Sequence, residues 1–166
     1  MDARLADYVR GQWPALVRYA TLLCGDASEA EEIVQSTLTR VALRWPFVEG
    51  KDNPDGYVRR ALVRACIDSG KRRRREPAVE MLPERGVPDR TDAFADSDQV
   101  RRALATLPPR QRAVLVLRYL DDASEATTAV LMGCSVGTVK SQTARALAKL
   151  RDLVDFGAGD VMKDLR

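Results

Sequence analysis

Apolar residues recur every three or four positions along most of the chain, which is the period of one face of an α-helix. This pattern predicts three helices in the first part of the chain, over residues 3–25, 27–45 and 55–75, with a loop at 46–56. Pro14 would start a new turn of the first helix or kink it. The apolar positions expected to be buried are Leu5, Tyr8, Val9, Leu16, Tyr19, Leu22, Leu23, Ile33, Val34, Leu38, Val41, Trp45, Val58, Leu62, Ala65 and Cys66.

Helix-capping and helix-breaking residues stand at the ends of these segments. Gly25 suits the stop of the first helix, and Asp26 with Glu29 three positions later fits a capping box at the start of the second. Pro46 would end the second helix. Asn53 or Asp55 would begin the third.

Four shorter helices are predicted over residues 97–106, 109–120, 124–132 and 135–151. Proline stands at the start of the second of these, and its expected core positions are Val114, Leu115, Leu117 and Leu120. Ser124 suits an N-cap, and Gly133 suits the end of the third helix. Two helices joined by a short turn with glycine form the helix-turn-helix pattern, which we therefore predict for the end of the chain.

Residues 76–96 separate these two groups of helices. They contain three prolines, a glycine and many acids, and we interpret them as a flexible acidic linker. The sequence thus predicts an all-α protein with two small helical modules. The N-terminal three-helix module would span 1–75, the C-terminal four-helix module 97–155, and a tail 156–166.

The composition excludes several kinds of site. Histidine is absent, so there can be no Ser-His or Cys-His nucleophile pair and no imidazole metal ligand. The three cysteines are far apart in sequence and no Gly-rich phosphate loop is present, so we expect no enzyme, metal or cofactor. No apolar run is long enough for a membrane span, and the first residues do not resemble a signal peptide. We therefore expect a cytoplasmic protein without membrane contact.

Positive charge is concentrated in two blocks. Residues 59–75 carry a net charge of +7 and residues 133–151 carry +4, whereas residues 76–98 between them carry −5. Two separate basic surfaces are typical of a protein that binds nucleic acid. The alternative is a pair of solvated basic helices without a partner.

The last predicted helix has two different faces. On a helical projection Val136, Val139, Thr143, Ala146, Leu147 and Leu150 form a stripe that would face the core. The opposite side carries Thr138, Ser141, Gln142, Arg145 and Lys149, with Lys140 on its flank. These are cations and hydrogen-bond donors that can contact bases and phosphates, so this face is a candidate for DNA.

Two stretches resemble a known family. "LPPRQRAVLVLRYLDD" with "TTAVLMGCSVGTVKSQTARALAKLR" is similar to the C-terminal domain of extracytoplasmic-function (ECF) sigma factors of bacterial RNA polymerase. "LVRYATLLCGDASEAEEIVQSTLTRVALRW" resembles the first part of their N-terminal domain, and the short chain with "GTVKS" resembles the small actinobacterial type. The resemblance implies a sigma factor whose partners are core RNA polymerase (the β′ and β subunits), promoter DNA and, in some cases, an anti-sigma factor.

The resemblance also implies roles for individual residues. The polymerase-binding residues would be Glu31, Glu32 and Gln35. The −35 promoter element would be read by Ser135, Thr138, Lys140, Ser141, Gln142 and Arg145. The −10 element would be contacted by Phe47, Arg59, Arg60, Arg64, Lys71, Arg72, Arg73, Arg74 and Arg75. The first module would thus bind polymerase and melt the −10 region, and the second would recognise the −35 element.

Some positions depart from the family pattern or leave alternatives. Gln142 replaces a common arginine, and Thr127 replaces a glutamate whose local cap or ion pair is then in question. In the family, loop 46–56 captures an unstacked −10 base. Trp45 and Tyr57 fit core stripes better than such a role, whereas Phe47 in the loop could have either role.

Two other functions agree with parts of the sequence. A stand-alone helix-turn-helix regulator would need only the second module and leaves the first unexplained. A helical protein-interaction adaptor would bind a regulatory partner and would bind DNA only weakly.

Overall fold

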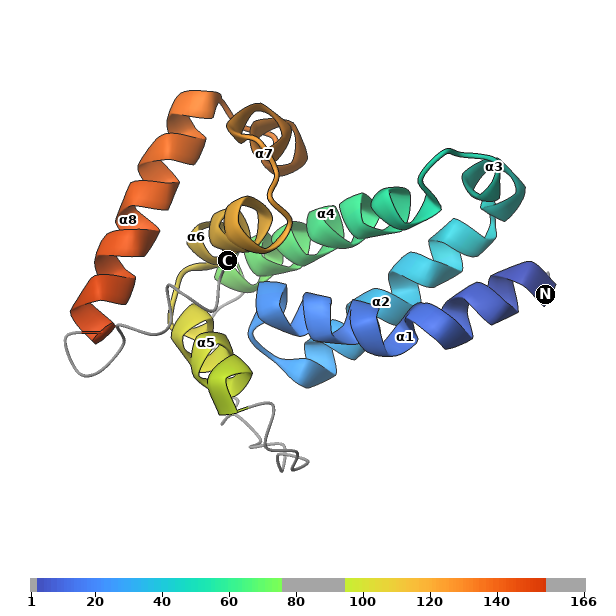
Figure 1. Cartoon of the computed structure of the whole chain (residues 1–166), viewed down its shortest axis with the longest axis horizontal. Helices are drawn as coiled ribbons and strands as arrows, with labels where there is room; N and C mark the ends of the chain where they lie inside the picture. The colour runs from blue at the N-terminus through green and yellow to red at the C-terminus, as the bar shows by residue number, and fades with distance from the viewer. Residues whose placement is uncertain (1–2, 76–94, 155–166) are drawn as a thin grey trace.

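The computed structural model describes residues 3–75 and 95–154, without the side chains of 74–75, 95–99 and 153–154. Every regular element in these ranges is a helix, as the sequence predicts (Figure 1). The elements are α1 (Ala3–Cys24), α2 (Ala27–Ala42), α3 (Trp45–Glu49), α4 (Pro54–Arg75), α5 (Ala95–Ala105), α6 (Pro109–Leu115), the π-helical turn η2 (Val116–Leu120), α7 (Glu125–Met132) and α8 (Val136–Val154). The expected linker falls outside the described residues up to position 94, and the expected tail does so entirely.

The first module, α1–α4, contains one helix more than predicted. α1 continues through Pro14 without a break in the helix. α2 ends at Ala42, and the short α3 occupies the first part of the expected loop because Pro46 stands at the start of a helix, where proline is tolerated. Asn53 caps α4, since its Oδ1 accepts the backbone N–H of Gly56 at 2.7 Å.

The predicted capping box at the start of α2 is only half formed. Asp26 caps the helix as expected, and its Oδ1 accepts the N–H of Glu29 at 2.8 Å. The Glu29 carboxylate does not return to the cap. It accepts a hydrogen bond from Ser69 Oγ at 2.6 Å and pairs with Arg73, so it joins α2 to α4. Glu29 therefore bonds to residues of α4 and not to the backbone at the start of its own helix.

The second module, α5–α8, has the predicted helix-turn-helix at its end. Ser124 caps α7 by accepting the N–H of Thr127 at 3.0 Å, so the cap is present with threonine at this position. Gly133 ends α7 with a φ of 61°, in the left-handed region that glycine adopts without strain. The predicted helix over 109–120 is α6 followed by η2, which continues the same path with wider turns.

Most of the predicted core is buried in one continuous cluster that runs through both modules. Val139, Ala146 and Leu150 of α8 are at most 2% exposed, which confirms the facing of this helix. Val136, the first residue of α8, is 39% exposed, and the expectation that it faces the core was wrong. Leu120 is also exposed, at the end of η2.

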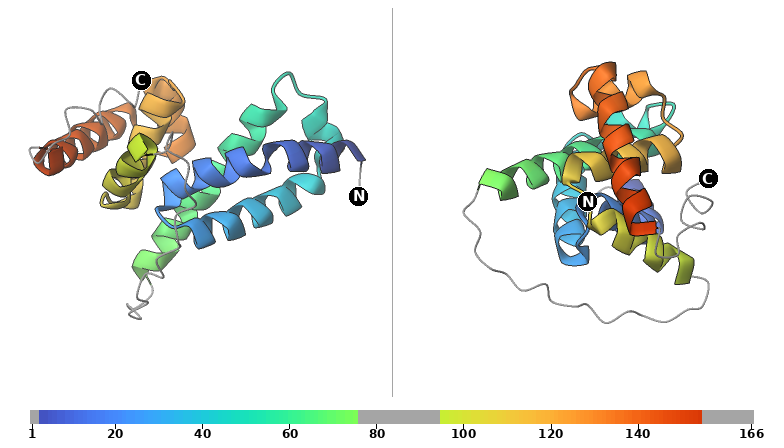
Figure 2. Two further views of the ribbon diagram at one scale, coloured as in Figure 1. Left: turned by 60° about the horizontal axis from the view of Figure 1, so that its bottom comes forward. Right: turned by 90° about the vertical axis from the view of Figure 1, so that its left-hand side faces the viewer.

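The two modules pack against each other, with α5 and α6 against α1 and with α6 and α7 against α4 (Figures 1 and 2). Arg112 of α6 is the buried polar residue at this module interface and is only 6% exposed. Its Nη1 donates to the Leu23 carbonyl at 3.1 Å, its Nη2 to Leu107 at 2.9 Å and its Nε to Leu104 at 3.0 Å. Burial lowers the pKa of this guanidinium, but arginine remains charged at neutral pH.

Two glycines allow the modules to approach closely. Gly25 has a φ of 81°, and a Cβ there would lie 2.5 Å from Nη1 of Arg112. At Gly70 a Cβ would lie 2.9 Å from Cβ of Pro109. A larger residue at either position would force α6 away from α1 or α4.

Asp121 makes a second polar contact across the module interface. Its carboxylate accepts a hydrogen bond from Tyr19 Oη of α1 and pairs with Arg59 of α4 at 3.2 Å. Burial and the hydrogen bond to Asp121 raise the pKa of Tyr19 well above its ordinary value, so the hydroxyl keeps its proton and remains a donor. Arg59 also lies over the Tyr19 ring, 5.2 Å from its centroid.

We predict that Arg112→Met lowers the free energy of unfolding by about 3 kcal/mol, because three buried carbonyls lose a charged donor. Chemical denaturation of the full chain measures this. Arg110→Met is the matched control, since it removes the same charge two positions away from a less buried site. Equal stability of the two variants would show that Arg112 does not stabilise the fold.

Candidate nucleic-acid interface

α8 is the outermost helix of the second module and lies on the side away from α1–α4 (Figure 2). Its face opposite the core carries Lys140, Ser141 and Arg145, which are exposed, and Thr138 and Gln142, which are half-buried. The geometry therefore brings together five of the six residues predicted to read the −35 element. The sixth, Ser135, caps α8 by accepting the N–H of Thr138 at 3.1 Å.

The polar face of α8 is held by local contacts. Ser141 donates to the Thr138 carbonyl at 3.0 Å, and Lys140 lies 3.7 Å from Glu125 of α7. The Lys140 pair is exposed, and such pairs contribute at most about 1 kcal/mol, so it leaves the lysine available to another anion. The Ser135 hydroxyl accepts the backbone N–H of Thr138. One fewer N–H group at the start of α8 is therefore available to bind a phosphate.

Phe47, predicted to contact the −10 element, is exposed on α3, and the other residues predicted to do so extend along α4 and are exposed where their side chains are described, from Arg59 to Arg73. Several of them have acidic partners: Arg59 pairs with Asp121, Lys71 with Asp68 at 3.8 Å, and Arg73 with Glu29. Arg60, Arg64 and Arg72 are exposed on the same helix. Arg74 and Arg75 complete the helix, and their side chains lie outside the described residues.

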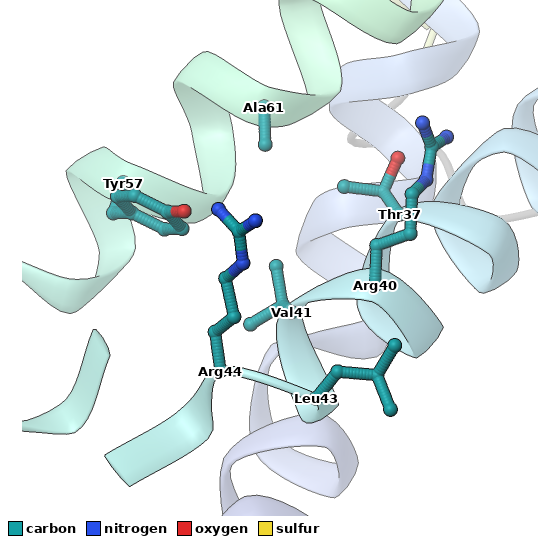
Figure 3. Close-up of a pocket in the computed structure, with 7 residues that line it drawn as sticks. All are labelled: Thr37, Arg40, Val41, Leu43, Arg44, Tyr57 and Ala61. Carbon is teal, nitrogen blue, oxygen red and sulfur yellow. The ribbon is translucent and has the colours of Figure 1, made fainter. Parts of the chain in front are cut away.

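A pocket of about 320 Å³ lies between the end of α2 and the first turns of α4. Figure 3 shows Arg44, in the turn between α2 and α3, extending toward Tyr57 and Ala61 of α4, with Arg40 on the other side of Thr37. The Thr37 hydroxyl is buried and has no hydrogen-bond partner. An aromatic ring, two guanidinium groups and an unpaired hydroxyl are a combination that can bind a planar polar ring.

The aromatic residues near this pocket differ in burial. Trp45 is 3% exposed and packs 5.0 Å from the Tyr8 ring, which confirms its place in the core. Tyr57 is half-buried, so it contacts the core and also lines the pocket. Phe47 is 64% exposed on α3 with Lys51 Nζ 4.2 Å from its ring. Sequence patterning missed the role of Arg40 and Arg44, because each looks like an ordinary cation at a helix end.

Glu31, Glu32 and Gln35 are all exposed on α2. Glu31 and Gln35 are four positions apart and therefore share one face of the helix. The three residues form an acidic and amide surface on α2. Among the described residues, no group of three potential metal ligands lies close enough to hold an ion, and no helix is long and apolar enough to cross a bilayer.

Comparisons with known proteins match both modules in the observed order. The family model "Sigma-70 region 2" matches residues 9–76, and "Sigma-70, region 4" matches residues 97–150. The RNA polymerase sigma-E factor of Streptomyces coelicolor is 38% identical over 147 residues, which cover 88% of this chain and 83% of that protein. The ECF RNA polymerase sigma factor EcfG of Rhodopseudomonas palustris is 30% identical over 169 residues, covering 96% and 93%. The chain belongs to the ECF sigma factors.

The fold of this sigma factor also agrees with a solved structure. A co-crystal structure of the sigma factor RpoE in complex with the anti-sigma factor NepR from Bartonella quintana has a TM-score of 0.62 and 23% identity. The match covers 94% of this chain and 99% of that one. At this identity the similarity concerns the fold alone.

The family matches place the described surfaces within sigma regions. The region 2 match contains most of α1, all of α2–α4 and the pocket of Figure 3, and the region 4 match contains α6, α7 and nearly all of α8. The matched family, the sigma factors, is not a family of enzymes. Arg112 and Asp121 belong to region 4, and their contacts with region 2 had no signal in the sequence.

Proposed function

We propose that this sigma factor binds its partners through three helix faces: α2 binds core RNA polymerase, α8 reads the −35 element, and α4 with the adjoining pocket binds the −10 element. The observation that carries the proposal is that these three helix faces are exposed and carry suitable charge. The protein would act in the cytoplasm, where polymerase and chromosome meet.

The α2 face suits the polymerase. Glu31, Glu32 and Gln35 offer carboxylates and an amide on an exposed helix, and none of them is needed for the core. Acidic residues there would repel DNA phosphates, so a protein partner fits this face better than nucleic acid. Without a polymerase, the same residues would only favour the helix N-terminus through its dipole.

The α8 face suits the major groove. Arg145 and Lys140 can bind phosphates or guanine, and Gln142 can form a bidentate pair with adenine. The helix lies at the outer edge of the protein, so a duplex could reach it without displacing another helix (Figure 2). A basic helix without a DNA partner would explain the charge, but it would not explain why acids are absent from residues 133–151.

The pocket between α2 and α4 suits an unstacked base. Its volume lies in the range of small-ligand pockets, and stacking of a base on an aromatic side chain contributes about 1–3 kcal/mol. Tyr57 supplies the ring, and Arg44 lies beside it. We therefore assign base capture to Tyr57, while the exposed Phe47 supports the neighbouring strand.

The packed arrangement of the modules limits access to α4. Arg59 cannot contact DNA fully while it pairs with Asp121 of the second module. Promoter engagement therefore requires that the modules separate, at least at this contact. An anti-sigma factor would be a further partner, since the B. quintana relative was crystallised with one.

The alternatives are separated by binding to core polymerase. In gel filtration we expect stoichiometric co-elution, and Glu32→Ala with Gln35→Ala should weaken it about tenfold because two contacts are lost. Asp7→Ala with Gln12→Ala on α1 changes the charge equally and should have no effect. Tight DNA binding without co-elution would instead identify a stand-alone regulator, and neither binding event would support an adaptor.

Promoter binding and promoter opening should be affected by different variants. Both properties can be measured on promoter DNA fragments that the wild-type holoenzyme selects from a random library. Arg145→Ala should weaken their binding about tenfold. Tyr57→Ala should leave initial binding nearly unchanged but reduce permanganate reactivity of −10 thymines, because the unstacked base loses its stacking partner. Arg18→Ala on α1 is the control. Normal opening by Tyr57→Ala would refute the pocket assignment.

Asp121→Asn should loosen the module interface, since the amide cannot pair with the Arg59 charge. We expect a larger radius of gyration in small-angle scattering of the free protein and stronger promoter binding by holoenzyme. Asp122→Asn is a matched control, as Asp122 is exposed and has a φ of 48° that asparagine tolerates. If the two variants behave alike, the Asp121 contact does not control access to α4.

A further inference from the structure

Two of the three cysteines meet inside the first module. Cys24 is the last residue of α1 and Cys66 lies in the middle of α4, and their Sγ atoms are 3.2 Å apart. Both are free thiols, 42 positions apart in the sequence. A disulfide requires an S–S distance of about 2.05 Å, so a small adjustment of about 1.2 Å would join them. The positive φ of Gly25 ends α1 directly after Cys24, so no helical turn on its C-terminal side resists that adjustment.

A small oxidant can reach this pair. A cavity of about 180 Å³ at the module interface is lined by both cysteines, and its other walls include Glu29, Arg73 and Arg112. Cys24 is half-buried, whereas Cys66 is 5% exposed. Access from the cavity therefore favours Cys24 as the first sulfur to react.

The two thiols differ in reactivity as well as in access. The contact with the Cys24 sulfur and burial together raise the pKa of the Cys66 thiol far above its ordinary value. Because the thiolate is the reactive form, Cys66 is the poorer first nucleophile. In the second step its position compensates, since the fold holds its sulfur 3.2 Å from that of Cys24. Cys134, the remaining cysteine, lies in the turn between α7 and α8 and has no part in this contact.

We propose that Cys24 and Cys66 form a reversible disulfide when the protein meets a peroxide, so that this pair is a redox modification site. The Cys24 thiolate attacks one peroxide oxygen and breaks the O–O bond, which gives a sulfenic acid and one water. Cys66 then attacks the Cys24 sulfur, forms the S–S bond and releases the second water. Two thiols lose two electrons and two protons, and one hydrogen peroxide becomes two waters. A dithiol reductant reverses the cross-link by exchange.

The cross-link would join α1 to α4 and enclose α2 and α3 in one closed loop. A closed loop reduces the freedom of the unfolded chain, so oxidation should raise the melting temperature of the protein by roughly 10 °C. The bond also lies next to the Leu23 carbonyl that accepts from Arg112, so it would fix the surface of the first module on which the second packs.

The test uses the purified full chain, fully reduced and then exposed to hydrogen peroxide, with alkylation of the remaining thiols. We expect one alkylated cysteine in place of three and a mass about 2 Da lower before alkylation. After trypsin, the linked peptides should be YATLLCGDASEAEEIVQSTLTR and ACIDSGK, while YLDDASEATTAVLMGCSVGTVK carries the free Cys134. The native chain should cross-link at least about tenfold faster than the chain in urea, because the fold holds the sulfurs together.

Variants make the assignment specific. Cys134→Ser should keep the cross-link and the rise in melting temperature, whereas Cys24→Ser and Cys66→Ser should abolish both. The peptide map of the wild-type chain stands even where a serine variant folds poorly. Three alkylated thiols after peroxide, overoxidation of Cys24 without a linked peptide, or equal participation of Cys134 would each overturn the proposal.

Discussion

A buried guanidinium needs acceptors for its donors, and Arg112 finds three of them at the ends of helices. The Leu23 carbonyl belongs to the last turn of α1, and the Leu104 and Leu107 carbonyls lie at and beyond the last turn of α5. Carbonyls at a helix C-terminus lack partners within the helix and carry partial negative charge, so a cation satisfies them better than a neutral donor does. The bonds to Leu104 and Leu107 lie within the second module, and the bond to Leu23 joins the second module to the first.

The packing of the two modules follows from that arrangement. Because Arg112 requires the Leu23 carbonyl, α6 must approach the end of α1, and this approach is possible only with glycine at position 25. The same approach brings Pro109 against Gly70 and places η2 so that Asp121 reaches Tyr19 and Arg59. A chain whose sequence indicates two modules and a linker thus forms one continuous core.

Sequence patterning predicted the elements that depend on neighbouring residues. The helix period located the helices, and local capping rules located the ends at Asp26, Ser124 and Gly133. Patterning failed where a residue's partner is distant in sequence: Glu29 bonds to Ser69 instead of its own cap, and Arg112 binds a carbonyl 89 positions away. Arg112 looked like a basic residue at an ordinary helix start, since nothing nearby indicates its burial. The polar, exposed side of α8 could be predicted because an amphipathic helix shows both faces in its own sequence, whereas the pocket between α2 and α4 exists only after the two helices pack.

The two proposed promoter surfaces differ in how far their cations are already paired with acidic residues. This difference bears on what supplies the free energy for separating the modules. The α8 face is open, and the ion pair between Lys140 and Glu125 is exposed and therefore weak. The α4 face is partly neutralised by Asp121 and Glu29, and freeing Arg59 also means separating Asp121 from the Tyr19 hydroxyl. Full separation of the modules would add the Arg112–Leu23 bond and the apolar contact around it, a cost of several kcal/mol. Arg59 cannot bind phosphate fully before that separation, so DNA at this residue is a poor source of the energy. Polymerase binding through α2 uses a surface that is exposed in the packed form, and it can therefore supply the energy before α4 meets the promoter.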